Sequence, residues 1–387
     1  MVALLVLVLL AGPALPAAGQ TASDAVLGED VTAAGAVLWD PLDGRVLWGR
    51  APSTPRRMAS TTKIMTALLA VEAGTLDDTV AVSATAAAAD GEPGAATLGL
   101  RSGQRIGMRS LLTALMMRSG NDAAAAVAEH IAGSQDAFVA EMNARARELG
   151  LDGTQFLDTT GLSDSAAHHA SPVDLARLAQ TAMTVRGFAP LVGIYRADVP
   201  GFGMLTSRNL LLDRYRGATG VKTGYTALAG LCLVASATRG GRTYYTAVLD
   251  SDDAFTDTTV LLDHAFDAFR AVAADDVAAG VYRTADGTVP LRIVDGTPRT
   301  VPVAATVRVR STLLPTAPSP VVDGAGLGRA ELVVDGKVVD TATIESAGAL
   351  DAAPMRSPAA AAGAALEDAV RAFARATPRR APVRTGG

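Results

Sequence analysis

The sequence predicts an α+β protein, in which an antiparallel sheet encloses a block of helices and a small all-β domain follows. Apolar runs of strand length stand at both ends of residues 30–273, with helix-periodic runs between them. Residues 277–345 lose the helical period and carry repeated Asp-Gly pairs. A length of 387 residues, of which 49% are hydrophobic, is enough to bury two cores.

The first 19 residues are predicted to be an export signal. An unbroken apolar run over Val2–Ala11 has the length of a signal-peptide core and is too short to span a membrane. Ala17 and Gly19 are the small residues expected before a cleavage at Gln20. We therefore expect the chain to work outside the cytoplasm, in the cell wall or periplasmic space.

The sheet of the 30–273 domain is expected to start with a hairpin over residues 31–49. Its two apolar arms flank Asp40-Pro41-Leu42-Asp43-Gly44, which has the composition of a turn. A helix then starts near Ser60, with an apolar face at helical spacing, and ends near Gly74. Residues 79–107 are weakly periodic and are expected to form short strands and a loop.

Four further helices are predicted before the chain returns to strands. Two cover residues 109–117 and 122–132, and a third runs from Ser134 as N-cap to Leu149, with Gly150 after it. Ser171-Pro172-Val173-Asp174 is a strong helix start, because serine caps the helix and proline suits its first position.

The domain is expected to close with a strand pair and a helix. Apolar runs at 231–237 and 243–249 flank Arg239-Gly240-Gly241-Arg242, a hairpin signal, and a helix is predicted over 258–273. In the all-β domain, Asp335-Gly336 between two apolar arms predicts a type I′ turn. The tail, residues 349–387, holds a weak amphipathic helix. It fits either peripheral membrane contact or a solvated end.

Composition excludes several classes of function. A net charge of −5 and a pI near 5.5 argue against nucleic-acid binding. A single cysteine, Cys232, excludes an internal disulfide, and the four histidines do not have the spacing of metal ligands. We expect no metal and no cofactor.

Ser60 and Lys63 are the first candidate catalytic pair. Three residues apart on a helix, they lie on one face as neighbours. Serine becomes a nucleophile when a base accepts its proton, and lysine can be that base if burial or nearby cations lower its pKa. The helix N-terminus also offers free backbone N–H groups to Ser60.

Two more motifs follow in the chain. Ser119-Gly120-Asn121 is expected in a turn between two helices, and Lys222-Thr223-Gly224 at the start of an apolar strand over 228–237. S-x-x-K, S-x-N and K-T-G in this order form a known catalytic signature of enzymes with a serine nucleophile.

On these residues the sequence resembles the D-alanyl-D-alanine carboxypeptidases, the low-molecular-mass penicillin-binding proteins. The resemblance covers roughly residues 30–270 and implies a penicillin-binding, serine β-lactamase-like transpeptidase domain, with the β domain that this family often carries. It is strongest in four stretches: Met58–Leu69, Ser119–Ala124, Gly161-Leu162 and Gly220–Thr226.

The resemblance implies a role for each residue of the first two motifs. Ser60 is the acylated nucleophile, and Lys63 is its base. Ser119 relays a proton to the leaving D-alanine amine, and Asn121 orients Lys63 and the substrate amide. The substrate is the peptidoglycan stem peptide ending in D-Ala-D-Ala, and β-lactams acylate the same serine.

The third motif is implied to hold the substrate. Lys222 and Thr223 bind its terminal carboxylate, and Gly224 leaves room for its backbone along the strand edge. The oxyanion hole consists of the N–H groups of Ser60 and Tyr225.

Two departures from the family pattern keep alternatives open. One is Tyr225, a bulky residue directly after Lys222-Thr223-Gly224, whose ring is expected either to narrow or to line the cleft. The other is a missing arginine. The stretch 250–267, where an arginine often helps to bind the carboxylate in this family, has no Arg or Lys and six aspartates. This leaves a D,D-endopeptidase on the same scaffold as one alternative. A serine β-lactamase is another, although Glu129, Glu141 and Glu148 do not start an E-x-x-L-N motif. The alternative from another class is a non-catalytic cell-wall binding protein.

Overall fold

A computed structural model describes residues 27–89, 96–284 and 287–351. The chain divides into two compact units, one formed by Met1–Ala271 with Pro302–Ala304 and the other by Val272–Val301 with Ala305–Gly387. The predicted export signal and nearly all of the predicted tail lie outside the described residues.

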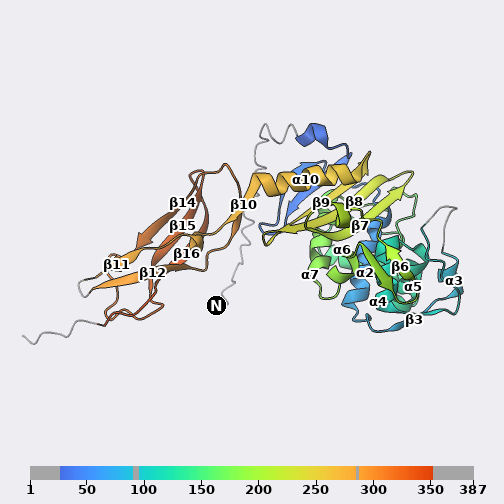
Figure 1. Cartoon of the computed structure of the whole chain (residues 1–387), viewed down its shortest axis with the longest axis horizontal. Helices are drawn as coiled ribbons and strands as arrows, with labels where there is room; N and C mark the ends of the chain where they lie inside the picture. The colour runs from blue at the N-terminus through green and yellow to red at the C-terminus, as the bar shows by residue number, and fades with distance from the viewer. Residues whose placement is uncertain (1–26, 90–95, 285–286, 352–387) are drawn as a thin grey trace, which may run out of the picture. The chain divides into compact units, whose positions relative to one another are not determined.

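The first unit is built on a five-stranded antiparallel sheet in the order β2-β1-β9-β8-β7 (Figure 1). The strands are β1 (Gly35–Asp40), β2 (Arg45–Arg50), β7 (Ala218–Thr226), β8 (Gly230–Arg239) and β9 (Arg242–Ser251). Strands from the start of the domain thus pair with strands from its end, as the sequence predicts. Because β7 is last in this order, one of its edges is free of a neighbouring strand.

The strands β1, β8 and β9 in the middle of the sheet are buried on both faces, which explains the nearly continuous apolar runs along them. Val37 of β1 packs into the core beneath the helical block, while its neighbour Leu38 packs into a second core under α10 (Ala254–Ala268). Figure 1 shows α10 on one side of the sheet and the helical block on the other. Each fully buried large aliphatic side chain contributes about 1.5–3 kcal/mol to folding.

The helical block and its short ribbons lie between β2 and β7 in the chain. Its elements are η1 (Ala59–Thr62), α2 (Lys63–Glu72), β3 (Thr79–Ala81), α3 (Ala84–Ala87), β4 (Arg105–Gly107), α4 (Met108–Arg118), α5 (Asn121–Ala132), α6 (Gln135–Glu148), α7 (Pro172–Thr184), α8 (Ala189–Val192), β5 (Arg196–Val199), β6 (Gly203–Thr206) and α9 (Leu211–Arg214). The predicted caps are confirmed. The Ser134 hydroxyl accepts a hydrogen bond from the Ala137 N–H, and the Ser171 hydroxyl accepts one from the Asp174 N–H, in each case three residues further along the chain.

The structure corrects two predicted boundaries. Lys222-Thr223-Gly224 does not start the strand over 228–237. It belongs to a separate strand, β7, since the chain turns at residues 227–229 and Gly230, the first residue of β8, has a positive φ of 65°. The helix predicted over 258–273 is α10, and both of its ends differ from the prediction. It starts at Ala254, because Asp253 caps the N–H groups of Phe255 and Thr256, and it ends at Ala268, where the chain becomes extended and forms a strand over Phe269–Val272.

The second unit is all-β, as predicted. Its five-stranded sheet has the order β11-β12-β16-β15-β14. Its elements are η2 (Ala274–Asp276), β11 (Val281–Arg283), β12 (Thr288–Val294), β13 (Arg299–Pro302), β14 (Val307–Leu313), β15 (Gly326–Val334) and β16 (Lys337–Ser346). Strand β10 (Phe269–Val272) belongs mostly to the first unit, whose main segment ends at Ala271. Asp335 and Gly336 have φ of 48° and 81°, which confirms the predicted type I′ turn between β15 and β16.

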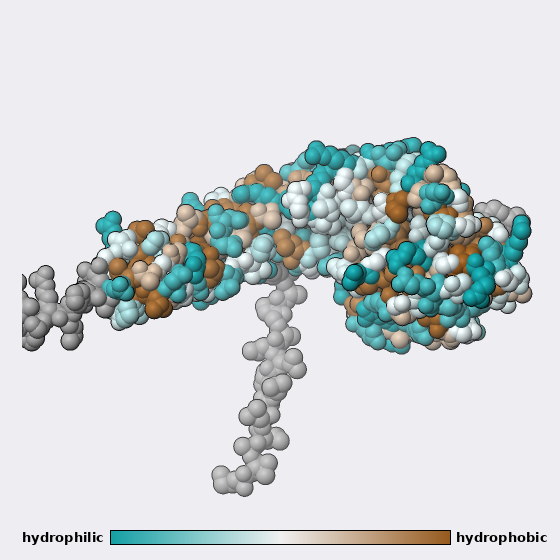
Figure 2. Space-filling model, turned by 60° about the horizontal axis from the view of Figure 1, so that its bottom comes forward, coloured by the Kyte–Doolittle hydropathy of each residue, from teal (hydrophilic) through white to brown (hydrophobic). Residues whose placement is uncertain are grey.

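The described surface mixes polar and apolar residues, and Figure 2 shows hydrophobic residues scattered among hydrophilic ones on one face. Tyr225, Leu228 and Leu231, on the hairpin between β7 and β8, are among the exposed apolar side chains. Within residues 27–89, 96–284 and 287–351, every helix is too short or too polar to cross a membrane.

Candidate active site

Ser60 lies in the turn η1, which comes directly before α2 and packs against the free-edged strand β7. A Cβ atom built on Gly224 of β7 would come within 3.1 Å of the Ser60 backbone nitrogen and of the Met58 carbonyl oxygen. Ala59, just before the serine, has a positive φ of 46°, which is costly for a residue with a side chain. The nucleophile candidate therefore sits on a strained turn held tightly against the sheet edge.

Lys63, the first residue of α2, is fully buried and points at Ser60. Its Nζ donates hydrogen bonds to Ser60 Oγ at 2.9 Å, to Asn121 Oδ1 at 2.9 Å and to the Thr160 carbonyl at 2.6 Å. Two of these partners, Asn121 Oδ1 and the Thr160 carbonyl, can only accept. When Lys63 is neutral its two N–H groups stay on those two oxygens, so that its lone pair faces the Ser60 hydroxyl.

The electrostatic surroundings favour that neutral form. Burial lowers the pKa of Lys63 from 10.5 to about 7, against the opposing charge of Asp158, and the positive charge of Arg208 adds to the lowering. A lysine with this pKa is half deprotonated near neutral pH, which suits a general base.

Ser119 lies in the turn between α4 and α5, and Asn121, which contacts Lys63, is the first residue of α5. Ser119 is the left-handed cap of α4 with φ of 69°, and Gly120 caps α5, as expected for a turn between helices. Ser119 Oγ and Asn121 Nδ2 are both buried and have no hydrogen-bond partner among the described residues. Buried polar atoms rarely stay unpaired, so both atoms are suited to bind a ligand or a solvent molecule.

The third motif brings a second buried lysine to the same place. Lys222 is 1% exposed and donates to the Thr223 carbonyl at 2.7 Å. Burial, and then the charge of Lys63, hold the pKa of Lys222 well below its usual value. The Tyr225 ring is 65% exposed, so it does not fill the space between β7 and Ser60.

Sequence reasoning missed four residues that bear on the lysines. Asp158, Thr160 and His168 lie in the segment between α6 and α7, next to the Gly161-Leu162 pair that carries part of the resemblance. Arg208 is held beside the second motif, because its backbone N–H donates to the Met117 carbonyl at 3.0 Å. No motif spacing points to these residues, since loops rather than helices or strands bring them to the site.

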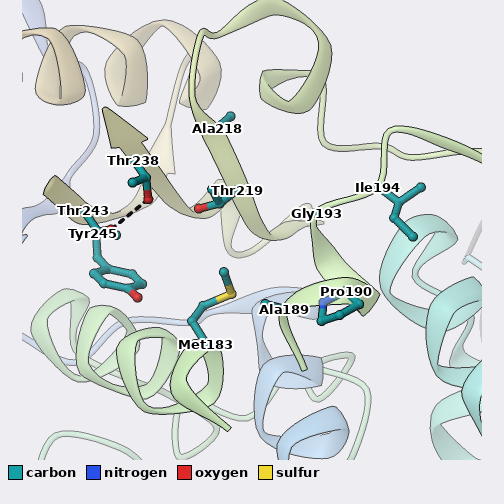
Figure 3. A pocket seen from close by; sticks show the side chains of 10 residues that line it. All are labelled: Met183, Ala189, Pro190, Gly193, Ile194, Ala218, Thr219, Thr238, Thr243 and Tyr245. Atoms are coloured by element: carbon teal, nitrogen blue, oxygen red, sulfur yellow. Dashed lines mark hydrogen bonds between the residues drawn. The ribbon is translucent and has the colours of Figure 1, made fainter. Parts of the chain in front are cut away.

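A pocket of about 490 Å³ lies away from these residues, at the other end of β7 (Figure 3). Ala218, Thr219, Tyr245 and Pro190 are among its lining residues, and no residue of the three motifs is. The Thr238 and Thr243 hydroxyls beside it are hydrogen-bonded to each other at 2.7 Å. The pocket offers no base or charged group, so the chemistry is to be sought at Ser60.

Comparison with known proteins agrees with this geometry. Residues 19–253 match the profile of a family described as D-alanyl-D-alanine carboxypeptidase, peptidase S11. D-alanyl-D-alanine carboxypeptidase DacF of Bacillus subtilis is 34% identical over 247 residues, which are 61% of this chain and 62% of the relative. The D-alanyl-D-alanine carboxypeptidase of Streptomyces sp. strain K15 is 34% identical over 252 residues, covering 60% of this chain and 86% of that protein.

The fold is also shared with solved structures. Penicillin binding protein 6B of Escherichia coli has a TM-score of 0.66 at 28% identity, over 81% of this chain and 95% of that chain. Penicillin binding protein 5 of Haemophilus influenzae has a TM-score of 0.64 at 25% identity, over 83% and 98%. These likenesses confirm the predicted fold class. The chain belongs to the family of the D-alanyl-D-alanine carboxypeptidases, serine peptidases of peptidase family S11.

Proposed function

We propose that the protein is a serine-type D-alanyl-D-alanine carboxypeptidase that removes the terminal D-alanine from peptidoglycan stem pentapeptides. The observation that carries the proposal is the 2.9 Å contact between Lys63 Nζ and Ser60 Oγ, made by a buried lysine whose pKa is about 7. We further propose that β-lactams acylate the same serine, that the protein is exported, and that the tail brings it to the membrane.

The first step is acylation of Ser60. Lys63 takes the hydroxyl proton as Ser60 Oγ attacks the carbonyl carbon of the penultimate D-alanine. The N–H groups of Ser60 and Tyr225 stabilise the oxyanion, and the loss of one such donor typically costs ~100- to 1000-fold in rate. The peptide bond then breaks, and the leaving D-alanine amine takes its proton through Ser119. Water attacks the ester, with Lys63 again as base, and releases the shortened peptide and free Ser60.

The substrate is held as an added strand on the free edge of β7. Gly224 is needed there, because a side chain would press on Ala59 and on the Ser60 backbone nitrogen. Asn121 Nδ2, unpaired in the structure, donates to the substrate amide. Lys222, Thr223 and Arg208 bind the terminal carboxylate. Arg208 thereby replaces the arginine that is absent from residues 250–267.

A serine β-lactamase is disfavoured by the positions of the three glutamates between the second and third motifs. Glu129 accepts hydrogen bonds from Ser83 and Gln135, and Glu148 pairs with Arg145. Glu141 is exposed on α6. A water-activating carboxylate would have to stand beside Ser60. A non-catalytic wall-binding protein has no need for two buried lysines with lowered pKa.

The experiment is D-alanine release from a stem pentapeptide, compared between wild type and Ser60→Ala. Ser163→Ala, which removes a hydroxyl from the neighbouring loop, is the matched control. We expect wild type and Ser163→Ala to form tetrapeptide at similar rates and Ser60→Ala to form none. Cleavage of cross-linked dimers without D-alanine release would favour the D,D-endopeptidase alternative. Turnover by Ser60→Ala would overturn the mechanism.

A further inference from the structure

Asp158 organises a tight turn directly behind the nucleophile, outside all three motifs. Its Oδ1 accepts hydrogen bonds from the backbone N–H groups of Thr160 at 2.7 Å and Gly161 at 2.5 Å, and from the Thr160 hydroxyl at 2.9 Å. Its Oδ2 accepts from the Ser163 N–H at 2.7 Å. Four donors on one carboxylate fix the path of residues 158–163.

The turn delivers two things to Lys63. The first is the Thr160 carbonyl oxygen, only 2.6 Å from Lys63 Nζ. The second is negative charge. The charged groups that bear on Lys63 are Asp158, Asp122, Lys222 and Arg208, and Asp158 is the carboxylate with the largest effect.

His168 supports the same arrangement without carrying charge itself. Its Nδ1 accepts from the Leu157 N–H at 3.0 Å, so Nε2 carries the proton and donates to Thr62 Oγ1 at 2.9 Å. Thr62 Oγ1 in turn donates to the Ala59 carbonyl at 2.8 Å, in the turn that bears Ser60. Burial lowers the pKa of His168 below 6.5, which keeps the ring neutral at pH 7.

We propose that Asp158 is a positioning residue for the base: its turn holds the Thr160 carbonyl on Lys63, and its charge offsets the cations of the cleft, so that Asp158 sets the pH above which the enzyme acylates. The inference rests on the proposed function, in which Lys63 is the base.

The direction of the effect follows from the charges. Asp158 raises the pKa of Lys63 against the lowering by burial. Removing its charge therefore lowers that pKa further and makes the amine neutral at more acidic pH. A nearby opposite charge shifts a pKa by ~1–3 units, and we expect a shift of about one unit here.

The test is the pH profile of acylation by a fluorescent penicillin. Asp158→Asn keeps the Oδ1 acceptor of the turn and removes the charge. Its acid limb, the low-pH part of the profile in which the acylation rate rises with pH, should therefore move about one pH unit lower. Asp164→Asn removes the same charge from an exposed position of the same loop and should leave the limb in place. A limb that is unchanged in Asp158→Asn, or that moves upward, overturns the inference.

Two further variants distinguish the charge of Asp158 from its effect on the turn, and the titration of Lys63 from that of His168. Asp158→Glu keeps the charge but displaces the turn, so the limb should stay while the plateau rate falls at least tenfold. An unchanged plateau contradicts the positioning role, and this variant also serves if Asp158→Asn does not fold. His168→Gln should keep an acid limb, since the titrating group is Lys63, and loss of the limb would assign it to the histidine instead.

The same labelling experiment distinguishes failure of the proposed function from failure of the inference about Asp158. If wild type is not labelled at any pH, the proposed function fails. If wild type is labelled with the same limb as Asp158→Asn, only the inference about Asp158 fails.

Discussion

The pH dependence of acylation follows directly from the burial of Lys63. Its pKa falls from 10.5 to about 7, a difference of about 3.5 units, which corresponds to about 5 kcal/mol at 1.36 kcal/mol per unit. At pH 7 about half of the Lys63 amines are then neutral, against about one in three thousand for a lysine with a pKa of 10.5. Burial therefore makes the base about a thousandfold more available at neutral pH.

The assay is the second-order rate of penicillin acylation from pH 5 to pH 10. We expect the rate to rise about tenfold per pH unit below a midpoint near 7 and to level off above it. Lys63→Arg keeps a charged guanidinium that is not a base, and should lose about 100- to 10,000-fold in rate at every pH. Lys337→Arg, an exposed lysine of the second unit, is the control and should match wild type.

A midpoint near pH 10, or a flat profile from pH 5 to 10, would refute the assignment of Lys63 as base.

The lowered pKa of Lys63 also makes the stability of the fold depend on pH. Because the folded-state pKa lies below the unfolded one, the buried charge destabilises the fold below about pH 7, and this cost is relieved as the pH rises from about 7 to 10.5. Wild type should therefore gain stability relative to Lys63→Met across that window, in urea unfolding.

Three more predictions concern the frame around the site. Gly161→Ala should lower the free energy of unfolding by about 2–4 kcal/mol, because φ is 88° there and a Cβ would lie 1.9 Å from the Ala59 carbonyl oxygen. Gly240→Ala, with positive φ but open space, should cost clearly less, and urea unfolding of both variants measures the difference. Arg208→Gln should slow acylation by carboxylate-bearing β-lactams about 10- to 100-fold and spare their methyl esters; equal loss for both excludes a carboxylate contact. Asp122→Asn should cost about 1–3 kcal/mol in urea unfolding, because the buried carboxylate accepts hydrogen bonds from three backbone N–H groups, those of Leu98, Leu100 and Ala123, and from one hydroxyl.

Local signals in the sequence predicted much of the fold. The caps at Ser134 and Ser171 and the turn at Asp335-Gly336 each depend on residues a few positions apart, and each is present in the structure. The short elements α8, β5, β6 and α9 were not predicted, since four-residue segments are held by tertiary packing rather than by their own periodicity.

The sequence predicted those residues of the site that belong to short contiguous motifs. Ser60, Lys63 and Asn121 were expected together, and the structure places them within hydrogen-bond distance. Asp158 and His168 were missed because they reach the site from a loop about a hundred residues away in the sequence. Asp158 acts through its charge and the Thr160 carbonyl, and His168 through the Thr62 hydroxyl. No spacing rule reads such contacts from one sequence.

The most direct test of the central claim is to locate the covalent adduct that a β-lactam leaves on the protein. After incubation with benzylpenicillin, digestion and mass spectrometry should find one penicilloyl group, on the peptide that contains Ser60, and none on Ser60→Ala. An adduct on another residue, or equal modification of Ser60→Ala, would contradict the assignment of Ser60 as the nucleophile.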